Sequence, residues 1–314
     1  MAIVRQCHEE AYIKKITSKI PVNRAMPPLH ATQDIDLSLS MSMSLMKSNS
    51  SDPEAACEPP KDTFVSFGSW NAALLAAGSV IEAIDRLMAK PTKLRNAFCG
   101  VRPPGHHAGS HGHDGASTNG YCVLNSVAIG AQHAFNKYNF KKIAILDFDV
   151  HQGNGTAQIV ERDPRILFIS LHASEIYPFS ESTKADADKC TDRIINIGYP
   201  TGTNGKQFME LFLNRCKQLL IDFSPELILL SSGFDAHIDD PTGAGMLRFA
   251  DYVALTRVVK EIADTPACRG RVISVLEGGY DIRALKLSVT AHLLALMEGP
   301  SCPPAPGEPE DEPD

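Results

Sequence analysis

The feature that most constrains the fold is a regular alternation of continuous apolar segments with amphipathic ones along residues 71–298. Segments such as KIAILDFDV and ELILLSSG lack the polar alternation of a half-exposed strand, which is typical of parallel strands buried on both faces. The segments between them carry apolar residues at helical spacing. The pattern predicts an α/β fold, a three-layer sandwich in which helices cover both faces of a mainly parallel sheet. Strands are expected at 96–101, 143–150, 166–171, 227–231 and 271–276, and helices at 71–89, 155–162, 205–223, 250–264 and 285–298.

Composition excludes several classes of protein. The 314 residues are 43% hydrophobic and 21% charged, which suits one large globular domain or two small ones. No run of about 18 apolar residues is present and the first 20 residues lack a signal-like apolar core, so we expect no membrane association. Eight scattered cysteines without a C-x-x-C pair indicate reduced intracellular thiols. The net charge of −7 and the lack of a basic stripe argue against direct nucleic-acid binding.

The chain divides into three parts. Residues 1–61 contain a Ser- and Met-rich low-complexity stretch at 37–60, whose composition favours a loop over a strand. Residues 62–299 hold the regular pattern and form the expected catalytic domain. Residues 300–314 are rich in proline and acid, typical of a disordered tail.

Polar side chains follow the predicted strands, each at the point where the strand ends. Ligands of open parallel sheets bind at the carboxyl ends of the strands, so these side chains are expected to form one shared site. They are His106 and His107 after 96–101, Asp147, Asp149 and His151 at the end of 143–150, His172 after 166–171, Asp235 after 227–231 and Tyr280 after 271–276.

Three of these residues have the chemistry of a metal site. Asp149 and His151 are two apart, and alternate side chains of a strand share a face, so the segment brings a carboxylate and an imidazole together. Asp235 would supply a third ligand from a neighbouring strand. Three protein ligands with one open position is the arrangement of catalytic Zn²⁺, although two carboxylates would also allow Fe²⁺ or Co²⁺ to compete.

The adjacent His106 and His107 follow a Pro-Pro-Gly turn and suit general acid–base catalysis beside a metal. Each imidazole needs a partner on its other nitrogen, and we expect Asp147 to serve one histidine and Asn154 the other. An amide cannot raise imidazole basicity as a carboxylate does, so the two pKa values should differ. The nearby His111, His113 and Asp114 are interpreted as part of a solvated Gly-rich loop.

The segment LEGGYD is the third catalytic element. Gly279, with the glycine before it, allows an unusual turn and a close backbone approach to a ligand. The hydroxyl of Tyr280 would then polarise a carbonyl and stabilise a developing oxyanion.

Together these elements resemble the zinc-dependent histone deacetylase superfamily, in its class II-like branch with acetylpolyamine amidohydrolase relatives. The motifs RPPGHHA, GYCVLNSVAIGA, ILDFDVHQGNGT, SLH, SSGFDAH with DDPTG, and LEGGYD occur in the family's order over roughly residues 62–298. Asn154 and Glu277 favour the class II side. The resemblance implies an arginase/deacetylase-like fold, a zinc-dependent protein (histone) lysine deacetylase, and an active site at the C-terminal ends of the strands.

The resemblance also implies a role for each matched position. It implies zinc ligands Asp149, His151 and Asp235; an acid–base pair His106 and His107 with partners Asp147 and Asn154; and Tyr280 as carbonyl polariser. It implies substrate binding by Asp62 at the rim, by Gly120, Tyr121, Tyr177 and Gly279 along an acyl-lysine tunnel, and by Thr242 near its mouth. A structural K⁺ ion is expected on Asp147, Asp149, His151, Ser170 and backbone carbonyls.

Two alternatives remain open at this point. An acetylpolyamine or other small-amide amidohydrolase would use an acid at the tunnel mouth to bind a second amine, and Asp239, Asp240 and Glu175 are candidates. A truncated, inactive binding module is the other, because the family usually begins some tens of residues before the match to CHEEAYIKKI. The expected partners are acetyl-lysine proteins, including histones, and corepressor-type proteins; the nucleus and the cytoplasm are both compatible locations.

Overall fold

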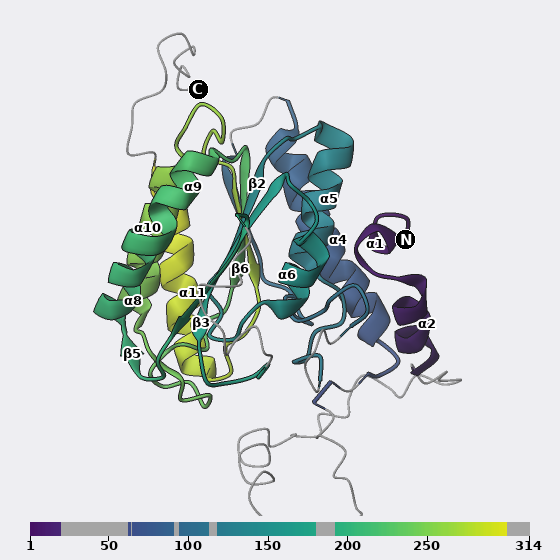
Figure 1. Ribbon diagram of the computed structural model, residues 1–314, viewed down its shortest axis with the longest axis horizontal. Coiled ribbons are helices and arrows are strands. Elements are labelled where there is room, and N and C mark those ends of the chain that lie inside the picture. The colour runs from purple at the N-terminus through teal and green to yellow at the C-terminus, as the bar shows by residue number, and fades with distance from the viewer. Residues whose placement is uncertain (20–61, 64, 91–93, 113–117, 180–191, 300–314) are drawn as a thin grey trace, which may run out of the picture.

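A six-stranded parallel sheet forms the centre of the computed structural model (Figure 1), which describes residues 1–19, 62–63, 65–90, 94–112, 118–179 and 192–299. Its strand order is β1-β8-β6-β2-β3-β4, and every neighbouring pair is parallel. The strands are β1 (Asn96–Cys99), β2 (Ile143–Asp147), β3 (Ile166–Ala173), β4 (Ile194–Tyr199), β6 (Leu227–Ser232) and β8 (Val272–Leu276), and β5 (Thr203–Asn204) and β7 (Gly245–Met246) form a separate small sheet.

Helices cover both faces of this sheet, as the sequence pattern predicts. In Figure 1 the green and yellow helices lie on one face and the blue and teal helices on the other, with the first two helices outside the blue and teal layer. The first group comprises α8 (Gly205–Phe212), the π-helix η2 (Leu213–Lys217), α9 (Gln218–Phe223), α10 (Phe249–Ala263) and α11 (Ile282–Met297). The second group comprises α4 (Ser69–Met88), α5 (Ser126–Tyr138) and α6 (Asn154–Val160), flanked by α1 (Val4–Cys7) and α2 (Glu10–Lys19).

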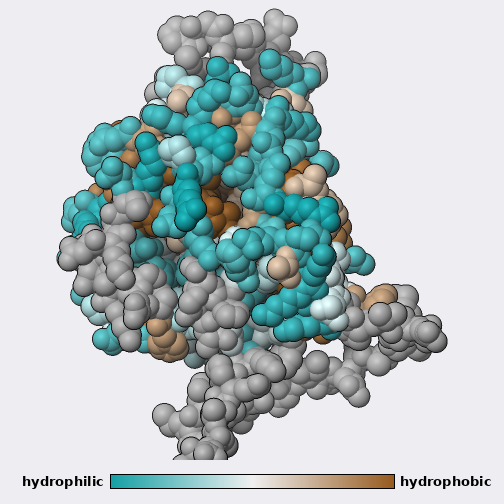
Figure 2. All heavy atoms as spheres, turned by 45° about the vertical axis from the view of Figure 1, so that its right-hand side comes forward, coloured by the Kyte–Doolittle hydropathy of each residue, from teal (hydrophilic) through white to brown (hydrophobic). Residues whose placement is uncertain are grey.

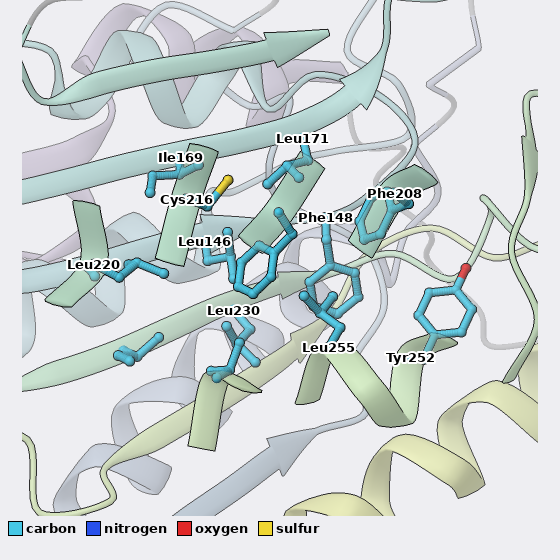
Figure 3. Packing of buried hydrophobic residues seen from close by; sticks show 14 of the residues in the cluster. Leu146, Phe148, Ile169, Leu171, Phe208, Cys216, Leu220, Leu230, Tyr252 and Leu255 are labelled. Atoms are coloured by element: carbon cyan, nitrogen blue, oxygen red, sulfur yellow. The ribbon is translucent and has the colours of Figure 1, made fainter. Parts of the chain in front are cut away.

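The period-2 geometry of the strands divides the core between the two faces. Leu146 and Leu230 pack with the α8–α11 helices, whereas their neighbours Ile145 and Leu229 pack with α4 and α5. Figure 3 shows the first cluster, in which Phe148 lies beside Leu255. All of these side chains are buried, which explains why the strand sequences are continuously apolar.

The predicted helix at 205–223 is interrupted by a π turn. Its buried residues Phe208, Phe212, Cys216 and Leu220 recur every four positions. In a regular α-helix, that spacing would drift by about 40° per step, because a turn holds about 3.6 residues. The wider π turn at Leu213–Lys217 compensates for the drift and keeps all four side chains facing the sheet.

Three features of the described residues bear on the expectations drawn from composition: the helices, the surface and the cysteines. No helix in the described ranges is both long and apolar enough to cross a bilayer. The face in Figure 2 is mostly hydrophilic, with hydrophobic side chains mainly in recesses. The five cysteines within the described ranges are free and buried. The low-complexity stretch 37–60, His113, Asp114 and the tail from residue 300 lie outside the described residues, so those predictions remain predictions.

Candidate active site and metal centre

The loop between β2 and α6 brings Asp149 and His151 to the carboxyl edge of the sheet. The predicted strand 143–150 is wrong at its end, because β2 stops at Asp147. Asp147 Oδ1 accepts the backbone N–H of Asp149 at 3.1 Å, and Asp149 Oδ1 accepts that of His151 at 2.9 Å. Each carboxylate thus bonds the N–H two residues on, which curls the chain away from an extended strand. The residues meet through these turns rather than by strand alternation.

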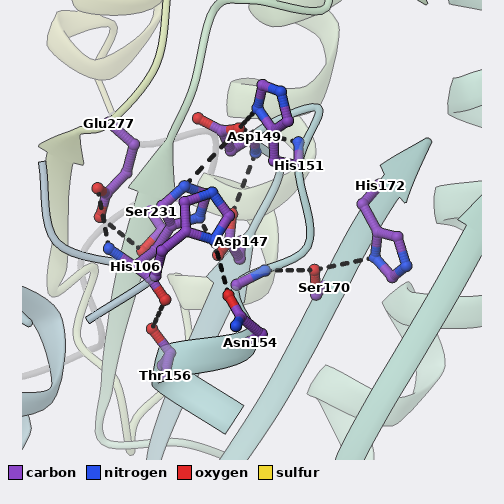
Figure 4. Close-up of polar contacts among 12 residues, drawn as sticks. His106, Asp147, Asp149, His151, Asn154, Thr156, Ser170, His172, Ser231 and Glu277 are labelled. Atoms are coloured by element: carbon purple, nitrogen blue, oxygen red, sulfur yellow. Dashed lines mark hydrogen bonds and ion pairs between the residues drawn. The ribbon is translucent and has the colours of Figure 1, made fainter. Parts of the chain in front are cut away.

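Asp235 joins them from the loop after β6, as predicted. Its Oδ2 atom lies 3.1 Å from His151 Nδ1, and Asp149 Oδ1 lies 3.0 Å from the same nitrogen. Backbone N–H groups fix both carboxylates: Val150 donates to Asp235 Oδ1 at 3.0 Å and Gly278 donates to Asp149 Oδ2 at 2.8 Å. One ligand atom from each of the three residues lies within 4.8 Å of the others, so the set converges on one point. Figure 4 shows two of the three, Asp149 and His151, close together.

The electrostatics of this cluster fit a cation. Both carboxylates are fully buried, and Asp235 Oδ2 faces the imidazole of His151. Burial opposes the charged form of His151, but hydrogen bonds to Asp149 and Asp235 outweigh it and raise the pKa of the imidazole to about 10. Burial and the charge of Asp149 raise the pKa of Asp235 to about 6. Two buried carboxylates this close require a positive charge, and the O, N, O donor set suits a divalent metal.

The tandem histidines lie after β1 and contact different partners. His106 Nδ1 lies 2.9 Å from Asp147 Oδ2, and His107 Nδ1 lies 2.7 Å from Asn154 Oδ1. This confirms the predicted pairing of one histidine with a carboxylate and the other with an amide. The two rings are 4.0 Å apart between centroids, and His107 lies 6.0 Å from the ring of His151. Both are therefore next to the ligand cluster.

The two partners give the histidines opposite protonation preferences. Burial lowers the pKa of His106, but the charges of Asp147, Asp149 and Glu277 outweigh it, so the pKa is raised well above its ordinary value. The pKa of His107 is lowered well below its ordinary value, first by burial and then by the positive charges of His106 and His151. His107 is therefore the neutral member of the pair.

Tyr280 reaches the same edge on the turn that follows β8. Gly279 before it has φ +123°, a conformation that favours glycine. Asp240 Oδ2 accepts the backbone N–H of Tyr280 at 2.7 Å and that of Asp281 at 3.3 Å, which fixes the turn. Burial and the charges of Asp235 and Asp149 raise the pKa of the Tyr280 phenol well above its ordinary value, so the hydroxyl remains a hydrogen-bond donor.

Two further tyrosines lie beside His107 and Tyr280. The ring of Tyr177 lies 4.8 Å from His107 in an edge-on contact, and Tyr121 lies 5.9 Å from Tyr280. Gly120, with φ +51°, lies against both His107 and Tyr177, since a Cβ there would lie 2.4 Å from the ring of His107 and 2.9 Å from that of Tyr177. The predicted tunnel residues thus surround the histidines and Tyr280.

Asp62 and Ser170 lie at the periphery of this arrangement. Asp62 Oδ1 accepts the hydroxyl of Thr63 at 2.7 Å, and its other oxygen accepts that of Thr118. Ser170 Oγ lies 3.1 Å from His172 Nδ1 and accepts the N–H of Gly153 at 3.4 Å. His172 therefore pairs with Ser170 and is not one of the three residues of the ligand cluster.

Sequence reasoning missed three contributions to the site. The sequence analysis used Glu277 only to indicate the class II branch. Its buried carboxylate in fact accepts backbone N–H groups of residues 102–107, called here the histidine turn. Arg102 donates to the carbonyl oxygen of Glu277 at 2.6 Å. Gly155 lets α6 approach the histidine turn, since a Cβ there would lie 2.4 Å from the carbonyl carbon of His107. The available signal was the residue type: charged residues (Arg102, Glu277) and a glycine (Gly155) within the motifs that carry the predicted site residues.

The chain matches a known protein family. The model for the histone deacetylase domain matches residues 1–296. The chain belongs to the histone deacetylase family. The chain is also similar to the crystal structure of the HDA15 HD domain, with a TM-score of 0.72 and 26% sequence identity, covering 95% of this chain and 75% of that one.

Curated relatives include deacetylases named for different substrates. Type-2 histone deacetylase 2 of Dictyostelium discoideum is 39% identical over 310 residues, covering 95% of this chain and 18% of that protein. Polyamine deacetylase HDAC10 of Mus musculus is 34% identical over 242 residues, covering 75% of this chain and 34% of that protein. The chain thus spans between about a fifth and a third of the length of these relatives.

Proposed function

We propose that this chain is a zinc-dependent deacetylase that hydrolyses acetyl-lysine in proteins to lysine and acetate. The observation that carries the proposal is the convergence of Asp149, His151 and Asp235 beside a buried histidine pair and Tyr280. Membership of the histone deacetylase family supports the same reaction class.

Asp149, His151 and Asp235 would hold the zinc. When bound, the metal supplies Lewis-acid activation of the amide carbonyl and of a water molecule. Neutral His107 takes the proton of the attacking water at Nε2, since its Nδ1 faces Asn154. The Tyr280 hydroxyl donates a hydrogen bond to the developing oxyanion. A proton from His106 or His107 then reaches the leaving amine.

The remaining predicted residues would bind the substrate and a second ion. Tyr121, Tyr177, Gly120 and Gly279 would line the path of the acetyl-lysine side chain, and Asp62 would bind the substrate backbone at the rim. A structural K⁺ ion would bind to Asp147, Asp149, His151 and Ser170. The buried oxygens of Asp147, Asp149 and Ser170 are the reason for this part of the proposal.

The protein substrate is favoured over a polyamine by the environment of the candidate acids. The carboxylate of Asp240 is buried and already accepts N–H groups of Thr242, Tyr280 and Asp281, so it is not available to a second amine. The Thr242 hydroxyl donates to the backbone of Asp235 at 2.8 Å. Only the exposed Asp239 and Glu175 remain of the three candidate acids, and solvent weakens their attraction for an ammonium.

The inactive-module alternative is weakened by the completeness of the site. A chain that acted only by binding partners would gain nothing from burying four carboxylates and two histidines at one edge, an arrangement that costs stability. Histones or other acetylated proteins, with corepressor-type partners, are the proposed partners, and the nucleus or cytoplasm the proposed location.

The test is a side-by-side assay of an acetyl-lysine peptide and acetylputrescine with the purified zinc-loaded protein. We expect kcat/KM for the peptide to exceed that for acetylputrescine by at least tenfold. A preference for acetylputrescine would replace the protein substrate by a polyamine, and no acetate release from either would support the binding module.

A further inference from the structure

We propose that Glu277 and Arg102 are positioning residues that lock the histidine turn to the turn carrying Tyr280. The proposal rests on the proposed function, because it concerns the geometry of that reaction. The two turns leave neighbouring strands, since Cys99 near the end of β1 pairs with Val275 near the end of β8. Their backbones therefore run side by side before each delivers a catalytic side chain.

The first half of the lock is the carboxylate of Glu277, which is completely buried. Its Oε2 atom accepts the backbone N–H of Gly105 at 2.7 Å and that of His106 at 3.2 Å. Its Oε1 atom accepts the hydroxyl of Ser231 at 3.1 Å. Figure 4 shows Glu277 reaching from one side of the site to His106 and Ser231. One side chain thus holds two successive N–H groups of the histidine turn.

The second half runs in the opposite direction. The guanidinium of Arg102, at the start of the histidine turn, donates to the carbonyl oxygen of Glu277 at 2.6 Å. Each turn therefore binds the backbone of the other through a side chain, and neither can shift alone. The next residue, Gly278, donates its N–H to Asp149 Oδ2, a predicted metal ligand, and none of the substitutions below removes this backbone donor.

The lock has a kinetic consequence that ordinary packing would not have. Asp147 orients the imidazole of His106 at Nδ1, whereas Glu277 fixes the backbone from which His106 and His107 project. A displacement of about 1 Å at such groups lowers turnover by about 100-fold, while substrate binding depends on other residues. Loss of the lock should therefore lower kcat with little change in KM.

The test compares Glu277→Met, which removes the acceptor at similar volume, with Glu277→Gln, which keeps an acceptor oxygen. Glu226→Met is the matched control, since Glu226 accepts the backbone N–H groups of Lys141 and Lys142 at the opposite end of the sheet. We expect Glu277→Met to lower kcat at least about tenfold, with KM within about threefold and one zinc per chain. Glu277→Gln and Glu226→Met should keep kcat within about threefold. Arg102→Met should fold, because Arg102 is exposed. We expect it to lower kcat at least about threefold with the same KM.

Amide hydrogen exchange of Gly105 and His106 by NMR tests the lock without any substrate. We expect exchange at least about tenfold faster in Glu277→Met than in the parent or Glu277→Gln, because two buried donors lose their acceptor. Unchanged exchange and unchanged kcat in Glu277→Met would overturn the proposal, as would equal losses of kcat in Glu277→Gln and Glu277→Met. Loss of zinc together with kcat would also overturn it, by showing a general structural role. If the parent releases no acetate, the proposed function fails, and the exchange rates alone decide on the lock.

Discussion

The Nδ1 atom of His107 lies 2.7 Å from the amide oxygen of Asn154, whereas its neighbour His106 faces a carboxylate. Two adjacent and equally buried histidines thus differ mainly in the charge of one partner. Burial and the positive charges of His106 and His151 lower the pKa of His107, and its amide partner does not offset them as a carboxylate would. His107 is therefore neutral, and a neutral imidazole is what a general base requires.

Replacing Asn154 by Asp should move the acidic limb of the pH–rate profile to higher pH. The new carboxylate favours the imidazolium, so the pKa of His107 rises and the base stays protonated over a wider pH range. A carboxylate at this distance raises a pKa by about one unit or more. The kcat/KM profile of Asn154→Asp against the parent measures the shift, and an unmoved or lowered acidic limb would show that His107 is not the base.

Removing the hydroxyl of Tyr280 should abolish most turnover but leave the metal in place. Tyr280→Phe loses a donor to the oxyanion, and loss of one such donor lowers kcat by about 100-fold or more. The control is Tyr252→Phe, because the buried Tyr252 hydroxyl has no hydrogen-bond partner in the described part of the chain. We expect full zinc content in both variants and parental kcat only in the control; parental kcat in Tyr280→Phe would contradict the role.

Adding a methyl group at Gly155 should disturb the histidine turn from behind. A Cβ there would lie 2.4 Å from the carbonyl carbon of His107 and 2.5 Å from that of Ala108, so the helix or the turn must move. Such overpacking costs about 1–3 kcal/mol. Gly78→Ala is the control, since it lies in α4 with no atom within 4 Å of the new Cβ and should stabilise by about 0.5–1 kcal/mol. Denaturant unfolding separates the two, and equal stabilities would refute the close approach.

Much of the fold was predictable because buried parallel strands are unmistakable in sequence. The five predicted strands all exist. The prediction missed β4, an edge strand with a partly exposed burial pattern, and the two-residue strands β5 and β7. Helix α5 was missed because it is rich in small residues and is buried on nearly all sides of its first two turns, so no apolar stripe marks it.

The sequence predicted which residues meet at the site, but not the hydrogen bonds that hold them in place. The strand-end rule brought Asp149, His151 and Asp235 together correctly, although the turns that do so were not foreseen. Glu277 acts on backbone N–H groups some 170 positions earlier in the chain, and no local pattern reports a contact of that kind.

Removing the metal should destabilise the fold as well as stop the reaction. A cation that binds only the folded state stabilises by about 2.7 kcal/mol at 100 times its Kd. For a domain of this size each kcal/mol shifts Tm by about 2–4 °C. Chelation should therefore lower the Tm of the parent by several degrees and leave that of Asp235→Asn unmoved; equal responses would contradict a stabilising metal at this cluster.

The central claim, that Asp149, His151 and Asp235 form a catalytic zinc centre, is tested most directly by metal analysis with hydroxamate titration of the purified chain. A hydroxamate is a bidentate metal ligand, so its binding reports an accessible ion rather than a buried structural one. The account predicts one zinc and one hydroxamate site per chain in the parent, and neither in Asp235→Asn. A parent chain that retains no stoichiometric zinc and binds no hydroxamate would contradict it.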